Sequence, residues 1–352
     1  MKIIISIAAI ILWGHIAFGQ ENGTLELLQE GVALHDKGEY EMAITKYEEV
    51  LTIDSSNVLA LYEMSYSQFA LGNYDEAVVL SQKSIRMDPD PQLLKQIYTT
   101  YANALDRMGK SKTAIKVYDA AIEDFPEYYH LYFNKGITLF SLEKYREAKT
   151  CFQISMTLNP EHAGSHNAMG RLLLMEENNI PALMALCRFM VIEPEGSRAK
   201  GNLPFIEEIM TGNVERTGKN SVSISIDEKM LDDIENSGDK EDDFSSIEFL
   251  LTLTAALDLD KKNKKKSERQ RFQEKFESVC DMMKESQGDN SGFLWEYYTP
   301  YFLVIREHDL TETLSYLVFA SSEDKDVLKW LGSHRDELDT FYGWSNSYVW
   351  EP

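Results

Sequence analysis

Small and apolar residues recur along the N-terminal half of the chain with the period of a helical hairpin. Five alanines stand 34, 37, 34 and 34 residues apart, and bulky apolar residues stand at fixed distances from most of them. This period predicts pairs of antiparallel helices, each of which packs against its neighbours. The alanines are Ala43, Ala77, Ala114, Ala148 and Ala182.

Two further positions share this frame. Twelve residues before each alanine stands a small residue, as two closely approaching helices require. Twelve residues after it stands a proline in four of the five units, which ends the second helix. The small residues are Gly31, Ser65, Ala102, Gly136 and Gly170. The prolines are Pro89, Pro126, Pro160 and Pro194, and Ser55 replaces the proline of the first unit.

The turn between the two helices of a unit is also marked. Gly38, Gly72 and Gly109 stand there in the first three units. Glycine adopts the left-handed conformation of a helix C-cap at little cost, because it has no Cβ. The sequence therefore predicts short turns and antiparallel hairpins.

This frame resembles the tetratricopeptide repeat (TPR) family over about Thr24 to Glu195. The resemblance implies an all-α fold, with a TPR α-solenoid of about five helical hairpins followed by a mostly helical C-terminal domain. Gln68 and Ser81 depart from the usual apolar pattern in the second unit. The solenoid is expected over residues 20–196, with repeats at about 24–57, 58–94, 95–128, 129–162 and 163–196.

The resemblance also implies a binding surface. In this family the concave groove receives peptides through the first helix of each unit. The candidates form a largely aromatic surface with a polar strip, unless the C-terminal domain folds back and covers them. They are Tyr62, Tyr66, Phe69, Asn103, Arg107, His130, Phe133 and Phe140.

The first residues have the pattern of a signal peptide. An apolar stretch follows Met1 and Lys2, and Ala17 and Gly19 are small residues suited to signal-peptidase cleavage before Gln20. We expect residues 1–19 to be removed, which gives an exported protein that is periplasmic or secreted. The alternative is an uncleaved anchor, for which the apolar stretch is short.

Residues 197–245 are expected to connect the repeats to the last domain. A helix is predicted over about Asn202 to Met210. Apolar residues at 222, 224 and 226 then alternate with serines, which is typical of a short strand in a β-hairpin that turns at Gly218. An acidic, solvated loop is expected over residues 236–246.

Residues 246–352 are expected to form a helical, aromatic-rich C-terminal domain. Two helices are predicted near Ser246 to Leu257 and Glu268 to Glu285, and the lysine-rich run 261–266 between them is expected to be a solvated linker or a contact for an acidic partner. Fourteen aromatic residues lie between Phe293 and Trp350. That density predicts a compact aromatic core, with an exposed recognition patch as the alternative.

Charge and motifs narrow the function classes. The net charge is −23, which argues against nucleic acids and anionic lipid surfaces and favours a basic partner. His162 and His166 are four residues apart, but they fall at packing and loop positions of the repeats, so we expect no metal site. The three cysteines are expected to be buried small hydrophobic residues. No catalytic motif and no cofactor site stands out.

The sequence therefore predicts a non-enzymatic scaffold or adaptor in the cell envelope, which binds a protein or peptide partner through the concave groove. It predicts no nucleic-acid partner and no membrane insertion after signal cleavage, and it leaves homo-oligomerisation open. The alternative is that the C-terminal domain is an unrecognised hydrolase or carbohydrate-binding module that the repeats present. A deep pocket lined by carboxylates and tryptophans would favour this alternative.

Overall fold

A computed structural model describes residues 23–212, 214–217, 222–224, 241–257, 266–286 and 290–350. The chain divides into two compact units, residues 1–148 and 149–352. The division lies inside the fourth expected repeat, so the fifth hairpin shares a unit with the C-terminal helices. The repeat and domain boundaries given above remain predictions.

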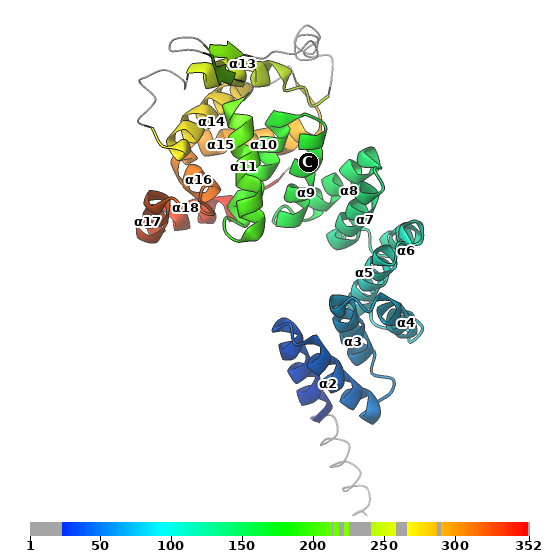
Figure 1. The fold of residues 1–352 in the computed structure, drawn as a ribbon. Helices are drawn as coiled ribbons and strands as arrows, with labels where there is room; N and C mark the ends of the chain where they lie inside the picture. Colours follow the sequence, from blue (N-terminus) through cyan, green and yellow to red (C-terminus); the bar gives the residue numbers. More distant parts are fainter. Residues whose placement is uncertain are drawn as a thin grey trace, which may run out of the picture. The chain divides into compact units, whose positions relative to one another are not determined.

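The N-terminal unit is a series of antiparallel helical hairpins (Figure 1). It opens with a helix over residues 23–36, and from α3 to α7 each helix packs on the one before it. The first helices of successive hairpins, α3, α5 and α7, also contact one another, which is the packing of a solenoid. The helices are α2 (Tyr40–Ile53), α3 (Val58–Leu71), α4 (Tyr74–Ile85), α5 (Pro91–Arg107), α6 (Ser111–Asp124) and α7 (Tyr129–Ser141); α8 (Tyr145–Leu158) crosses into the second unit.

The turns of the hairpins adopt the expected left-handed conformation. Gly38, Gly72 and Gly109 have φ angles of 80°, 86° and 75°. The fourth and fifth hairpins use the same conformation at the same position of the frame, but with side chains. Glu143 and Glu177 stand there with φ angles of 60° and 59°. A residue with a Cβ adopts this conformation at a cost that glycine does not have.

Close packing explains the small residues of the frame. All five repeated alanines are fully buried. A Cβ added to Gly31 would lie 2.4 Å from Cε1 of Tyr47, and one added to Gly170 would lie 2.8 Å from Cδ2 of Leu186. Both large residues stand four positions after the repeated alanine, so the small residue leaves room for the bulky one.

A second contact closes each hairpin of the N-terminal unit beside its turn. It joins the residues eight and three positions before the repeated alanine. The pairs are His35 with Tyr40, Phe69 with Tyr74 and Phe140 with Tyr145, whose ring centroids lie 5.0, 5.5 and 5.4 Å apart. In the third hairpin the Ser111 hydroxyl donates to Asp106 at 2.6 Å instead. We refer to these contacts as the hairpin clasps.

The second unit is built around α10 (Asn179–Ile192), which packs against α9, α11, α13, α15 and α16. Almost every side chain of α10 is buried, as expected for a helix that is apolar all round. Figure 1 shows α10 among its neighbours. The other helices of this unit are α9 (Ala163–Met175), α11 (Ser197–Thr211), α13 (Ser245–Leu257), α14 (Glu268–Glu285), α15 (Phe293–Glu307), α16 (Thr311–Val318), α17 (Lys325–Ser333) and α18 (Arg335–Ser347).

The connecting region contains the expected β-hairpin. Strand β1 (Val214–Arg216) pairs antiparallel with β2 (Val222–Ile224), and Arg216 lies opposite Val222. The helix expected from about Asn202 begins earlier, at Ser197, because Gly196 ends the preceding break with a φ angle of 92° and the helix continues through Pro204. The two later helices lie where the sequence predicts them, and α14 opens with a capping box at Ser267.

Several predictions lie outside the described residues. They are the signal segment 1–19, the hairpin turn at Gly218, the loop residues 236–240 and the lysines at 261–265. Within the part of the chain that the structure describes, no helix is both long and apolar enough to cross a bilayer.

Candidate functional site

A row of aromatic side chains lies along the first helices of the N-terminal unit. Tyr66 of α3 stacks on His35 with ring centroids 4.6 Å apart, and on Tyr62 at 6.3 Å. The planes of Tyr62 and Tyr66 differ by only 6°. His35 is held in place because its Nδ1 lies 2.7 Å from the Ser67 hydroxyl. These rings form one end of what we call the aromatic ladder.

The ladder continues toward α7. Thr100 of α5 and Tyr128 belong to the surroundings of the Tyr62 hydroxyl, whose pKa is raised mainly by burial. The ammonium group of Lys95 lies 4.7 Å from the centroid of the Tyr128 ring. Tyr128 in turn contacts His130 with centroids 5.1 Å apart. We define the aromatic ladder as His35, Tyr66, Tyr62, Tyr128 and His130.

Burial controls the charge state of the ladder. It raises the pKa of Tyr62, and it raises the pKa of Tyr128 to about 12. It also lowers the pKa of His130, with help from Lys95, and that of His35, against the opposing charge of Asp36. At neutral pH the ladder is therefore uncharged, and its rings offer apolar faces and hydroxyl groups to a ligand.

The structure brings only some of the predicted groove residues together. Tyr62, Tyr66 and His130 belong to the ladder, whereas Phe69 and Phe140 form hairpin clasps. Asn103 accepts a hydrogen bond of 2.5 Å from the buried Tyr118. Two further candidates belong neither to the ladder nor to a clasp. They are Phe133, which is half-buried on α7, and Arg107, which is exposed in the last turn of α5.

Sequence reasoning missed three contributors to this site. His35 stands in the first repeat at the clasp position, which the sequence-based list of candidates did not include for that repeat. Tyr128 precedes α7 and is its N-cap residue, so no helical face identified it. Lys95 was missed because a cation over a ring depends on the contact between neighbouring hairpins. The tyrosines spaced four apart on α3 were the only signal available for these rings.

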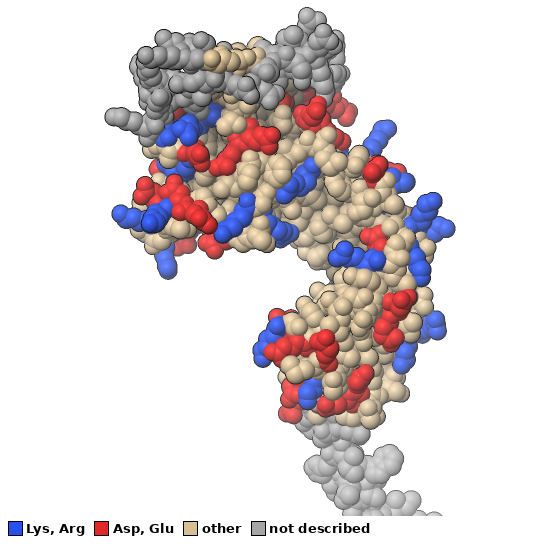
Figure 2. Space-filling view, viewed as in Figure 1, with Lys and Arg blue, Asp and Glu red and all other residues tan. Residues whose placement is uncertain are grey.

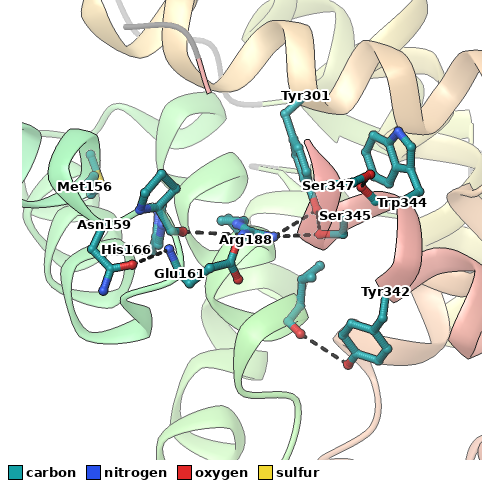
Figure 3. A network of polar contacts seen from close by, with 12 residues as sticks. Met156, Asn159, Glu161, His166, Arg188, Tyr301, Tyr342, Trp344, Ser345 and Ser347 are labelled. Atoms are coloured by element: carbon teal, nitrogen blue, oxygen red, sulfur yellow. Dashed lines mark hydrogen bonds and ion pairs between the residues drawn. The ribbon is translucent and has the colours of Figure 1, made fainter. Parts of the chain in front are cut away.

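The second unit holds a different cluster, in which a guanidinium group is completely buried (Figure 3). Arg188 of α10 donates to the hydroxyls of Tyr301 and Ser345, both at 3.0 Å. It also forms an ion pair with Glu161 and lies 5.0 Å from the ring centroids of Tyr301 and Trp350. This arginine therefore joins α10 to α15, to α18 and to the turn before α9.

His166 extends this cluster. Its Nε2 lies 2.9 Å from the Pro160 carbonyl, which can only accept, so Nε2 carries the proton. Its Nδ1 accepts from the Tyr298 hydroxyl at 2.8 Å. Burial, and then the charge of Arg188, lowers the pKa of His166 to about 3. This histidine is a neutral, satisfied core residue.

Half of the fourteen C-terminal aromatic residues are buried in the interior of the second unit, which agrees with the predicted aromatic core. Trp295, Tyr297, Tyr298, Tyr301 and Phe302 of α15 are all buried. Of the four tryptophans in this region, Trp295 is buried, and the other three, Trp330, Trp344 and Trp350, are half-buried. Among the described residues no group of histidine, cysteine or carboxylate side chains is placed to hold a metal ion. None of the three cysteines forms a disulfide, and all three are buried.

Comparison with known families identifies the N-terminal architecture. The TPR repeat family matches residues 31–72, and tetratricopeptide repeat families match residues 58–91 and 100–148. The chain carries tetratricopeptide repeats. Repeats of this kind build extended concave surfaces for protein contacts, so this TPR chain is a protein-interaction scaffold.

Curated relatives match less than half of the chain. The RNA polymerase II-associated protein 3 of Rattus norvegicus is 28% identical over 158 residues, which cover 44% of this TPR chain and 23% of that protein. The Homo sapiens protein of the same name is 28% identical over 137 residues, which cover 38% of this chain and 20% of that protein. The chain thus spans about a fifth of the length of these relatives.

Two solved structures show the same likeness. YrrB, described as a TPR protein with an unusual peptide-binding site, is 21% identical with a TM-score of 0.38, and the match covers 53% of this chain and 95% of YrrB. The Pseudomonas aeruginosa protein pilF is 21% identical with a TM-score of 0.46, and the match covers 53% of this chain and 82% of that protein.

Proposed function

We propose that this protein is a non-enzymatic scaffold of the cell envelope that binds an extended peptide, or an extended segment of a protein, along the aromatic ladder. One observation carries the proposal. Tyr66 keeps 41% of its surface exposed although its ring is held by stacking on His35 and Tyr62. Rigid, half-exposed tyrosines give a large contact area at low entropic cost, which is why they are common as anchors of interfaces.

The chemistry of the ladder fits a peptide better than a small charged ligand. Its rings are neutral at pH 7, and hydroxyl groups alternate with apolar faces along neighbouring helices. Such a surface suits the alternating side chains and backbone groups of an extended chain. The TPR architecture supports this proposal as well, because stacked hairpins present their first helices side by side.

A peptide-selection experiment tests the proposed function. The full chain is immobilised, peptides are selected from a random twelve-residue library, and their dissociation constants are measured by fluorescence anisotropy. Replacing Tyr66 with alanine should weaken binding of the selected peptides at least tenfold, because a buried aromatic anchor contributes about 2 kcal/mol or more. Tyr316→Ala is the matched control, since Tyr316 is a half-buried tyrosine of the second unit that stacks on Trp330.

Two outcomes would contradict the proposal. Peptides that bind Tyr66→Ala as tightly as the unaltered chain do not use the ladder. Peptides that lose binding only in Tyr316→Ala use the second unit instead. In either case the aromatic ladder is a packing feature of the repeats.

The envelope location needs its own test. The small residues Ala17 and Gly19 motivate a mature N-terminus at Gln20. The expected result is a mass for the native protein that corresponds to residues 20–352, in a fraction released with other exported proteins. A native protein that retains Met1 in the membrane fraction would overturn this part of the proposal.

A further inference from the structure

Two carboxylates stand at one end of the aromatic ladder without a cation. Glu63 lies on α3 directly after Tyr62 and three residues before Tyr66, so it shares a helical face with the Tyr66 ring. Asp36 follows His35 directly and is exposed. Neither Glu63 nor Asp36 forms an ion pair with a side chain of the described residues. We call this pair the acidic notch.

The two carboxylates of the notch repel each other electrostatically. Burial raises the pKa of Glu63, and the negative charge of Asp36 raises it further. Like charges at one place destabilise each other, and a cation between them removes that cost. Glu63 is half-buried on α3 beside Tyr62, so a positive group bound there is partly shielded from water and attracted more strongly than at a fully exposed carboxylate.

The rings beside the notch add a second attraction for a cation. His35, Tyr66 and Tyr62 are stacked almost parallel, and Tyr66 presents exposed ring surface. The face of a tyrosine ring attracts an ammonium or guanidinium group, especially where water is partly excluded. At the other end of the ladder this interaction is already made, because Lys95 lies over Tyr128. Within the described residues no arginine or lysine lies over Tyr62 or Tyr66.

We propose that the acidic notch, together with the faces of Tyr66 and Tyr62, binds an arginine or lysine side chain of the peptide that occupies the ladder. This inference rests on the proposed function, because it assigns the chemistry of the ligand at that same surface. The assignment also gives the bound peptide a direction along the ladder. A basic residue lies at the His35 end, and a neutral or acidic stretch lies beside Lys95.

The charge of the molecule agrees with this assignment. The chain carries 58 acidic and 35 basic residues. Figure 2 shows several groups of acidic side chains over the N-terminal hairpins in that view, with lysine and arginine side chains between them. A negative surface raises the local concentration of a basic segment and speeds its association, an effect that falls with ionic strength.

The test uses pairs of peptides that differ only in charge. Peptides selected on the full chain are synthesised with arginine or with citrulline, its neutral and nearly isosteric analogue, at each basic position. The unaltered chain should bind the arginine form at least tenfold more tightly at one position. Glu63→Gln should bring that ratio close to one, whereas the matched control Glu41→Gln, an exposed residue of α2, should leave it unchanged.

The outcomes separate this inference from the proposed function. If Tyr66→Ala abolishes binding but citrulline and arginine peptides bind equally, the ladder is the binding surface and the acidic notch takes no cation. If the arginine preference is the same in Glu63→Gln as in the unaltered chain, the cation lies elsewhere and the inference is wrong. If Tyr66→Ala has no effect on any selected peptide, the proposed function itself fails.

Discussion

The two units use the same residue types in opposite ways. In the N-terminal unit two histidines and three tyrosines form the aromatic ladder, with Lys95 over the Tyr128 ring, and Tyr66 is 41% exposed. In the second unit a histidine, tyrosines and an arginine form the cluster of Figure 3, where Tyr298 and Arg188 are completely buried. Tyr66 of the ladder keeps ring surface exposed, whereas Arg188 donates its hydrogen bonds to residues of its own unit.

The difference follows from what covers each helix. The buried cluster joins residues far apart in the sequence, and the hydrogen bond between His166 and Tyr298 spans 132 positions. The contacts of the ladder join neighbouring hairpins only. A local, repeating architecture leaves one face of its first helices uncovered within the repeats themselves, whereas a non-repeating domain closes over its aromatic residues. Aromatic content alone therefore does not identify a binding surface.

The largest expected difference between the units concerns their cations. Arg188→Ala should destabilise the protein by about 2–5 kcal/mol, because truncating this fully buried side chain leaves a cavity in the second unit and removes the ion-pair partner of Glu161. Lys95→Ala, which removes the cation over Tyr128, should cost no more than about 1 kcal/mol. Chemical denaturation of the full chain, followed by tryptophan fluorescence, measures both.

A further variant separates charge from packing in the buried cluster. Arg188→Met keeps much of the side-chain volume, and Tyr301 and Ser345 can then bond to each other, since their oxygens already lie 2.8 Å apart. It should therefore cost much less than Arg188→Ala. If Arg188→Ala is no more destabilising than Lys95→Ala, the buried cluster does not hold the second unit together and the comparison fails.

The sequence predicts the repeats well because their pattern is local. Each alanine, each turn glycine and each proline acts on residues within one hairpin, so spacing alone locates them. The apolar sequence of α10 also indicates that the helix is covered on all sides. The partners of Arg188 could not be predicted, because Pro160, Tyr301 and Ser345 come together only through the fold of the second unit. The TPR resemblance likewise identified Tyr62 and Tyr66 but not the stacking of His35 on Tyr66.

The two units should also differ in how a histidine of each, His166 and His35, makes the stability depend on pH. His166 has a pKa of about 3 in the folded protein and 6.5 as its ordinary value, so the unfolded chain binds more protons between those pH values. Stability is therefore complete above pH 6.5 and falls as the pH drops toward 3. From the slope of about 1.4 kcal/mol per unit, lowering the pH from 6.5 to 5 should cost about 2 kcal/mol through this residue.

Replacing each histidine in turn shows which one causes the loss of stability at low pH. His166→Gln should reduce the loss of unfolding free energy between pH 7 and pH 5 by about 2 kcal/mol. His35→Gln should reduce this loss of unfolding free energy by a smaller amount. His35 is only partly buried, and the negative charge of Asp36 opposes the lowering of its pKa. Equal pH dependence of the unaltered chain and His166→Gln would show that His166 is not held neutral in the folded state.

Overpacking tests whether the buried alanines of the repeat frame stabilise the N-terminal unit. Ala77 is fully buried where the two helices of the second hairpin approach each other, so Ala77→Leu should destabilise the protein by roughly 1–3 kcal/mol. Val79→Leu on the same helix is the control, because Val79 is 56% exposed and should tolerate the change. Equal unfolding midpoints for the two variants would mean that the alanine frame does not mark helix contacts.

The smallest expected effect compares the turns of the repeats themselves. Glu143 adopts the left-handed conformation that Gly38, Gly72 and Gly109 adopt in the earlier hairpins. That conformation costs a residue with a Cβ about 1–2 kcal/mol. Glycine avoids this cost, but it loses more conformational entropy on folding, which offsets part of the stabilisation. Glu143→Gly should therefore stabilise the protein by up to about 1 kcal/mol, and Gly72→Ala should destabilise it by a similar amount. If both changes lower the unfolding midpoint, then the Glu143 side chain contributes a contact that outweighs the strain of its backbone.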